Sequence, residues 1–288
     1  MTGFFEVALL LSAPILLAAA GELVLERAGS IQIGTEGTML IGAFATFAAA
    51  RRGGTPATAV LVGLVVGALF GLVFAAVAVV RRADPILVGT AWNLLALGVT
   101  AYGYRLVAGE TGAVLEVRTL PHAIFGLPVL VVAAFFVPAV LHLFLEKTRP
   151  GLLLSAAGEN PEAVLGVGGS VVAVRTWASV FAGAFAGLAG GLLIVTVSPT
   201  FVEGVTAGRG FLALALVVFA RWKPLRLLPG ALLLGGATAL QYRLQATGST
   251  NVPYAFLLAL PGLLALSALA FSSARGGAPK ALGTPAPE

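Results

Sequence analysis

The sequence predicts an all-α protein, a polytopic transmembrane helical bundle of about eight to ten spans. Of its 288 residues, 59% are hydrophobic and only 10% are charged, and the mean hydropathy is +1.02. A soluble domain carries about 25% charged residues. A soluble core of this length could not hide so much apolar surface, so the chain belongs in a membrane.

Apolar runs of spanning length occur at about nine places along the chain. They are 4–25, 38–50, 56–80, 86–102, 122–145, 176–197, 210–220, 227–243 and 253–271. The runs 38–50 and 210–220 are too short to cross alone, so they either need flanking residues or are broken helices that line a cavity. Phe4–Ala20 is predicted to be a span and not a cleaved signal, because no Lys or Arg precedes it and Glu6 lies within it.

Orientation follows from the basic residues. If Gly151–Arg175 is cytoplasmic, the alternation of spans divides the 17 Lys and Arg residues eleven to six, as the positive-inside rule requires. The inside group is Arg27, Arg81, Arg82, Lys147, Arg149, Arg175, Arg221, Lys223, Arg226, Arg275 and Lys280. The N-terminus is then outside and the C-terminus cytoplasmic. Residues 1–274 form one transmembrane domain, and 275–288, rich in Pro, Gly and Ala, are predicted to be a disordered cytoplasmic tail.

The segment Gly151–Arg175 is the longest break in the hydrophobicity and contains the start of a short helix. Asn160 is suited to the N-cap, Pro161 to the first helical position, and Glu162 to the positive end of the helix dipole. Gly166 would end this helix after one turn. A helix so short cannot hold itself in water. We therefore expect a soluble partner to brace it at the membrane face.

Small residues mark two spans and a possible repeat. Glycines recur at every fourth position in 56–80 and in 176–197, which predicts close packing of ordinary bundle helices. The residues are Gly63, Gly67, Gly71, Gly183, Gly187 and Gly191. Separately, 39–54 resembles 211–226, and the predicted topology runs these segments in opposite directions. Weakly similar inverted halves are a common transporter plan.

Three polar constellations are candidates for a substrate path, because polar side chains at membrane depth are costly and normally face a cavity. In 26–37 the candidates Gln32, Thr35 and Glu36 stand among glycines that permit a re-entrant or broken backbone. The alternative is an interfacial loop whose glutamates stay in water.

The second constellation is Trp92 and Asn93, where an aromatic face beside an amide suits a planar polar ligand. The alternative is Asn93 bonding a neighbouring backbone, with Trp92 as packing. The third is Glu203 and Arg209 in a glycine-rich break, which could pair, bind substrate or dock a partner. Its alternative is a solvated outer loop.

Several classes are excluded or disfavoured. The absence of cysteine excludes disulfides and thiolate chemistry, and only His122 and His142 are present, so we expect no metal site. The basic residues fall between apolar runs, which indicates topology and not nucleic-acid binding. The chain has no GxSxG, HExxH or GxxxxGK[ST] pattern. It is therefore not expected to be an enzyme, and any driving ATPase must be another chain.

At this point the chain resembles the permease subunits of bacterial ABC importers of the branched-chain amino acid and simple-sugar group. Within that group it is most similar to permeases of nucleoside-type importers served by a basic-membrane-protein lipoprotein. The matching pieces are GELVLERAGSIQIGTEGTMLIGAFATF (21–47), WNLLALG, AAGENPEAVLGVG (156–168), FAGAFAGLAGG (181–191) and VTAGRGFLALALVVFARWKPL (205–225). Where the family usually has Asn, this chain has Gln32, which leaves the exact ligand open.

The resemblance implies one site that docks the ATPase and another that lines the substrate path. The coupling helix that docks on the ATPase would be Gly158, Glu159, Asn160, Pro161, Glu162 and Ala163. The substrate path would include Gln32, Glu36, Asn93, Glu203 and Arg209. Implied partners are an ABC ATPase that binds the ATP, a second and different permease, an extracytoplasmic binding lipoprotein and the lipid of a bacterial inner membrane; no cofactor is expected in this chain.

The predicted function is translocation of a small polar solute, most simply a nucleoside, by rocking of bundle halves around a midplane cavity. A simple sugar or a branched-chain amino acid is the alternative substrate. A rival class, an ion-coupled secondary transporter, would need buried carboxylates, for which only Glu6, Glu22 and Glu36 qualify. An intramembrane enzyme is disfavoured by the lack of paired carboxylates and of a histidine dyad.

Overall fold

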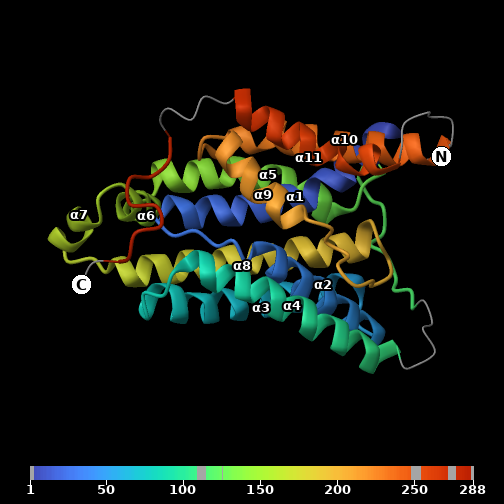
Figure 1. Cartoon of the computed structure of the whole chain (residues 1–288), viewed down its shortest axis with the longest axis horizontal. Coiled ribbons are helices and arrows are strands. Elements are labelled where there is room, and N and C mark those ends of the chain that lie inside the picture. Colours follow the sequence, from blue (N-terminus) through green and yellow to red (C-terminus); the bar gives the residue numbers. More distant parts are fainter. Residues whose placement is uncertain (1–2, 109–114, 125, 248–253, 272–276, 287–288) are drawn as a thin grey trace.

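The computed structural model describes residues 3–108, 115–124, 126–247, 254–271 and 277–286. Within these ranges the chain is almost entirely helical, and its long helices run along one axis of an elongated bundle (Figure 1). The only β pairing in the described part consists of two isolated bridges. The predicted all-α fold is confirmed.

Every predicted apolar run contains a helix. The long helices are α1 (Phe4–Arg27), α2 (Thr35–Arg51), α3 (Pro56–Phe74) with its π-helical extension η1 (Ala75–Val80), α4 (Pro85–Ala108), α5 (Val129–Lys147), α8 (Val171–Thr196), α9 (Arg209–Phe219), α10 (Leu227–Thr247) and α11 (Tyr254–Phe271). The short helices are α6 (Arg149–Glu159), α7 (Pro161–Gly166) and η2 (Pro224–Arg226). Among the described residues, α1, α3 with η1, α4, α5 and α8 are long and apolar enough to cross a membrane.

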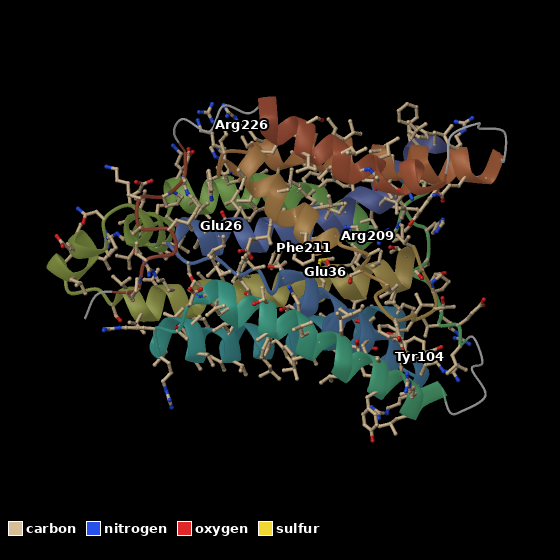
Figure 2. All side chains as sticks on the ribbon, viewed as in Figure 1. Glu26, Glu36, Tyr104, Arg209, Phe211 and Arg226 are labelled. Carbon is tan, nitrogen blue, oxygen red and sulfur yellow. The ribbon has the colours of Figure 1, made fainter. Side chains whose placement is uncertain are left out.

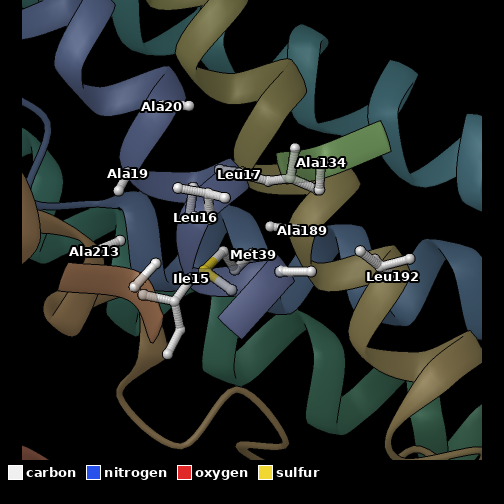
Figure 3. Packing of buried hydrophobic residues seen from close by; sticks show 14 of the residues in the cluster. Ile15, Leu16, Leu17, Ala19, Ala20, Met39, Ala134, Ala189, Leu192 and Ala213 are labelled. Carbon is white, nitrogen blue, oxygen red and sulfur yellow. The ribbon is translucent and has the colours of Figure 1, made fainter. Parts of the chain in front are cut away.

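Helix α1 is the centre of the bundle. Of its most apolar stretch, 83% is buried inside the protein, against 17% for α4. Ile15 and its neighbours on α1 pack against Met39 of α2, Ala134 of α5, Leu192 of α8 and Ala213 of α9 (Figure 3). Helix α1 therefore serves as the common packing surface for both halves of the chain, whereas α3, α4 and α5 leave most of their apolar surface exposed.

The two glycine stripes form one interface. A Cβ on Gly67 would overlap the carbonyl oxygen of Gly183, and a Cβ on Gly183 would overlap that of Gly67. Gly187 meets the backbone of Gly63 in the same way. The backbones of α3 and α8 thus touch directly, which only glycine permits. The predicted close packing is confirmed.

Helices α2 and α9 begin inside the bundle. After α1 the chain turns back at 28–34, a largely buried segment, and α2 starts near the middle (Figure 1). Helix α9 also starts near the middle and runs the opposite way (Figure 1). At 1.5 Å per residue, α9 is about 16 Å long, well short of a bilayer core of about 30 Å. Helix α9 is thus a broken helix, one of the two alternatives that the sequence predicts for 210–220, whereas α2 (17 residues) extends the run 38–50 at both ends.

The polar break at Gly151–Arg175 is shorter than predicted. Most of its first half is helix α6, and Arg175 lies within α8. Thr148 caps α6 by accepting a hydrogen bond from the backbone N–H of Gly151 (3.2 Å). Ser170 caps α8 in the same manner through Ala173. Helix α6 was not predicted from the sequence, and α8 begins at Val171, before the predicted run 176–197.

The C-terminal tail also differs from the prediction of disorder over 275–288. Its described part, 277–286, lies against α6 and α8. The Arg175 guanidinium donates to the carbonyl oxygens of Thr284 (2.6 Å) and Ala281 (3.4 Å). The backbone N–H of Ala281 donates to the carbonyl of Gly158 (2.8 Å). A segment with little apolar surface is thus ordered through its backbone, because a buried arginine supplies donors.

Candidate functional site

A partly buried carboxylate joins the starts of α2 and α9. Glu36, in the first turn of α2, accepts hydrogen bonds from the Thr206 hydroxyl (2.5 Å) and from the backbone N–H groups of Gly208 (2.9 Å) and Gly210 (2.6 Å). We call these four residues the Glu36 junction. In Figure 2, Glu36 lies near the middle of the bundle beside the start of α9. One side chain of the first half therefore satisfies the free amides of a half-helix in the second.

The backbone before α9 is shaped for this contact. Ala207 (φ 47°) and Gly208 (φ 79°) are both in the left-handed region. From this turn the N–H groups of Gly208 and Gly210 converge on the Glu36 carboxylate, and converging backbone N–H groups form an anion-binding concavity. The N-terminal dipole of α9 adds to the attraction. Ala207 carries a side chain in a conformation that such residues rarely adopt, so the backbone is strained at this position.

Arg209 is adjacent to the junction but points elsewhere. Its guanidinium donates to the carbonyl of Thr206 (3.1 Å), lies 3.4 Å from that of Val205, and donates to the hydroxyl of Tyr242 on α10 (3.1 Å). The side chain is buried, at 7% exposure. Arg209 therefore links α9 to α10. The sequence left open a pairing of Arg209 with Glu203, and the structure does not show that pairing.

Gln32 and Thr35 lie together against Glu22 of α1. The Glu22 carboxylate accepts from the Gln32 backbone N–H (2.9 Å) and from the Thr35 hydroxyl (2.9 Å). The Gln32 amide donates to Thr38 (3.3 Å). All of these groups are buried. The segment 28–34 is thus an ordered, re-entrant backbone held by α1, not an interfacial loop in water.

Asn93 and Trp92 hold the start of α2 from the outside. The Asn93 side chain accepts from the Gly37 N–H (2.8 Å) and donates to the Ile33 carbonyl (3.1 Å). Trp92 packs against Phe70 with ring centroids 4.7 Å apart. Both hydrogen-bonding ends of Asn93 are therefore engaged by backbone in this conformation.

Glu203 lies apart from the other candidates. It is exposed and lies 3.9 Å from the guanidinium of Arg105, which is exposed as well. Both residues lie at the end of the bundle that is opposite α7. The structure therefore brings Gln32, Thr35, Glu36, Asn93 and Arg209 around the starts of α2 and α9, and leaves Glu203 at the surface.

The predicted coupling segment forms a capped helix, α7, at the end of the bundle opposite Glu203. Asn160 accepts from the Ala163 N–H through its side chain (3.4 Å), and Pro161 is the first residue of α7. Glu159, Asn160, Glu162 and Ala163 are exposed.

The support beneath this helix is buried. Val164, at 1% exposure, packs with Ala157, Val171 and Ala286. A Cβ on Gly158 would overlap the carbonyl oxygen of Arg27, so α6 touches the end of α1. The exposed residues of α7 are therefore presented on a braced platform that connects directly to the central helix.

Two groups of functional candidates escape the sequence reasoning. Glu26 accepts a hydrogen bond from the Trp222 indole and so connects the end of α1 to the turn after α9. The second group lines a cavity of about 480 Å³ between α9, α10 and α11. Its α10 members are Thr238, Gln241, Tyr242 and Gln245. Their spacing of three, one and three residues is a helical stripe, and all but Gln245 lie within the predicted run 227–243.

Metal binding finds no support in the described part of the chain. No three His, Asp or Glu side chains there lie close enough together to hold an ion. The hydrogen bonds above occupy the carboxylates of Glu22, Glu26 and Glu36 with N–H and O–H donors. Their arrangement suits the holding of backbone segments in position.

A helical membrane bundle in which two opposed helices start inside the bundle at a shared polar junction has the architecture of a transport permease. Residues 4–268 match the family described as "Branched-chain amino acid transport system / permease component". The chain belongs to this family.

Its relatives are similar along nearly their whole length. The chain is 33% identical to the guanosine ABC transporter permease NupQ of Bacillus subtilis, covering 96% of this chain and 94% of the relative. It is 32% identical to the nucleoside ABC transporter permease NupC of Lactococcus lactis, with 96% and 93% covered. A permease of Haloferax volcanii named for glucose is 36% identical, with 85% and 79% covered.

One solved structure has a similar fold. It is a metal-chelate type ABC transporter in an inward-facing conformation, matched with a TM-score of 0.50 at 16% identity over 93% of this chain and 86% of that chain. At this identity the likeness supports the fold and nothing about the substrate.

Proposed function

We propose that the chain is the permease subunit of an ATP-driven importer that carries a nucleoside across a bacterial inner membrane. The observation that carries the proposal is α7, an exposed capped helix on a braced platform, in a chain without an ATP-binding loop of its own. A helix of 6 residues has no stability alone. Its exposed face fits a docking element for a separate ATPase.

The proposed mechanism is mechanical. ATP binds to the partner ATPase, whose closure pushes on α7; the push reaches α1 through the contact of Gly158 with Arg27. The Glu36 junction then joins the two halves as they rock. The chain itself makes and breaks no bond and holds no cofactor.

The proposal includes two further partners. A second, related permease chain completes the pathway, and a binding lipoprotein delivers the solute from outside. The end that carries α7 faces the cytoplasm, which places the N-terminus outside. Basic residues support this orientation, because Arg27, Arg82 and Arg175 all lie at the end of the bundle that carries α6 and α7.

The docking proposal is tested with Glu162→Arg, which reverses a charge on the exposed face, and with Val164→Pro, which breaks α7. With the purified partners in proteoliposomes, both variants should lose most uptake and most of the co-purified ATPase subunit while still inserting in the membrane. Glu116→Arg makes the same charge change at the opposite end and should keep the ATPase bound. If Glu162→Arg and Val164→Pro transport normally, α7 is not the docking element.

The substrate proposal rests on the two relatives named for nucleosides or guanosine. A sugar is the second candidate, because the Haloferax volcanii relative is named for glucose. Uptake of labelled guanosine, glucose and leucine by the reconstituted importer, with its own binding lipoprotein, separates the two. If the importer takes up glucose and does not take up guanosine, the substrate is a sugar and not a nucleoside.

A further inference from the structure

The cavity between α9, α10 and α11 has a polar wall inside an apolar bundle. Its volume of about 480 Å³ lies in the range of roughly 300–1,000 Å³ that holds small molecules. The polar wall is the stripe Thr238, Gln241, Tyr242 and Gln245 on one face of α10. Thr238 and Gln241 are buried, at 7% and 4% exposure. Polar side chains at such depth are costly and usually face a substrate or ion pathway.

The stripe offers hydrogen bonds that the protein leaves unused. The Gln245 amide nitrogen is buried and has no hydrogen-bond partner among the described residues. The Tyr242 oxygen accepts from Arg209, which leaves its own proton to donate. The Thr238 hydroxyl donates within its helix to Leu234, which leaves its oxygen as an acceptor. A ligand that supplies complementary groups would satisfy the wall.

The charge of the lining narrows the ligand class. Arg209 is the charged residue among the lining residues that the structure describes, and none of these is Asp or Glu. A free amino acid would bring an ammonium group without an anionic partner here. A neutral solute rich in acceptors suits a guanidinium, a phenol and amide nitrogens. Phe211, at the start of α9, adds an aromatic ring to the lining and can pack on a planar ring.

We propose that this cavity is the permease's own binding site for the base of the transported nucleoside, with Tyr242 and Gln245 as specificity-determining residues. The inference rests on the proposed nucleoside transport and adds where in the chain the solute is recognised. Arg209 positions the Tyr242 hydroxyl, and so the site begins directly beside the Glu36 junction. A rearrangement of the junction would then alter the cavity wall.

The test measures binding to the permease without its binding lipoprotein. The complex with the second permease and the ATPase is placed in nanodiscs, and guanosine, D-ribose and leucine are titrated by saturation-transfer NMR. Guanosine should bind, with ribose and leucine far weaker. Tyr242→Phe and Gln245→Leu should each raise the Kd for guanosine about 5- to 10-fold, because each removes one hydrogen bond.

The control is Tyr102→Phe, the same change on an exposed tyrosine of α4 outside the cavity, which should leave the Kd unchanged. Co-purification of the ATPase shows that each variant assembles. An unchanged Kd in both cavity variants overturns the inference. Guanosine uptake by the wild-type importer is read separately: its absence overturns the proposed substrate, whereas the cavity is judged by the effect of its own variants on guanosine binding.

Discussion

Glu36 carries a negative charge into the middle of an apolar bundle, and donors that lie far along the chain hold it there. The three donors belong to Thr206, Gly208 and Gly210. Hydrogen bonds to a charged acceptor are about twice as strong as neutral ones. At the scale of the single residue, Glu36 therefore links the two halves through three hydrogen bonds to a carboxylate.

Replacing this charge should destabilise the protein. Glu36→Gln removes the charge and turns one acceptor into a donor that faces an N–H group, so we expect a loss of about 2 to 3 kcal/mol in the free energy of unfolding. Thr206→Val removes only one donor and should cost about 1 kcal/mol. Thermal unfolding in detergent, followed by intrinsic fluorescence, measures both. Equal effects of the two variants would contradict a role for the charge.

The polar residues at the centre could be identified from the sequence, but their hydrogen-bond partners could not. Gln32, Glu36 and Arg209 stand out because polar groups inside apolar spans are costly. Nothing local pairs Glu36 with Gly210, since tertiary folding alone brings them together. The prediction left Glu203 and Arg209 as one constellation because they are close in sequence; the turn at 207–208 separates them. Tyr242 escaped because an uncharged residue barely interrupts the apolar run 227–243, and Gln245 escaped because it lies just beyond that run.

At the scale of elements, the α3–α8 contact depends on glycine. Gly67→Ala places a Cβ into the backbone of Gly183 and should cost about 1 to 3 kcal/mol, since the helices must separate. Gly98 on α4 has open space around its Cβ position. Gly98→Ala should be neutral or stabilise by up to about 1 kcal/mol, because alanine favours helix. Thermal unfolding of the pair measures the contrast, and similar midpoints would refute the tight contact.

Which elements form could be predicted well, because each apolar run of sufficient length became a helix. Bounds were less certain where caps decide them. Thr148 and Ser170 start α6 and α8 inside a stretch whose glycines predict a break. The glycines there are tolerated because Gly151 and Gly158 pack against other backbone, a tertiary reason that no local pattern reveals.

At the scale of the whole molecule, the end of the chain fastens the platform under α7. Composition predicts disorder for this tail, since it cannot bury much apolar surface. The burial of Arg175 changes the outcome, because its guanidinium needs acceptors and the tail carbonyls of Ala281 and Thr284 provide them. Ala286 completes the small apolar cluster around Val164.

Removal of the tail should loosen the platform. A chain that ends at residue 276 loses the two tail acceptors of Arg175, whose Nε still donates to the Ala28 carbonyl, and loses the contact of Ala281 with Gly158. We expect amide hydrogen exchange in α7 to become at least about 10-fold faster, because local opening is less costly. Exchange mass spectrometry in nanodiscs measures it, with a chain that ends at residue 286 as control. Equal exchange in both chains would show that the tail does not support α7.

The Glu36 junction can form only late in the synthesis of the protein. Glu36 and Thr206 are separated by 170 residues. At a synthesis rate of about 5 to 20 residues per second, Glu36 waits roughly 10 to 30 s before its partners exist. During that interval the first half cannot complete its interior, and α2 is a half-helix with an open end. The nascent chain therefore enters the bilayer unfinished, and its first helices become native only when the second half arrives.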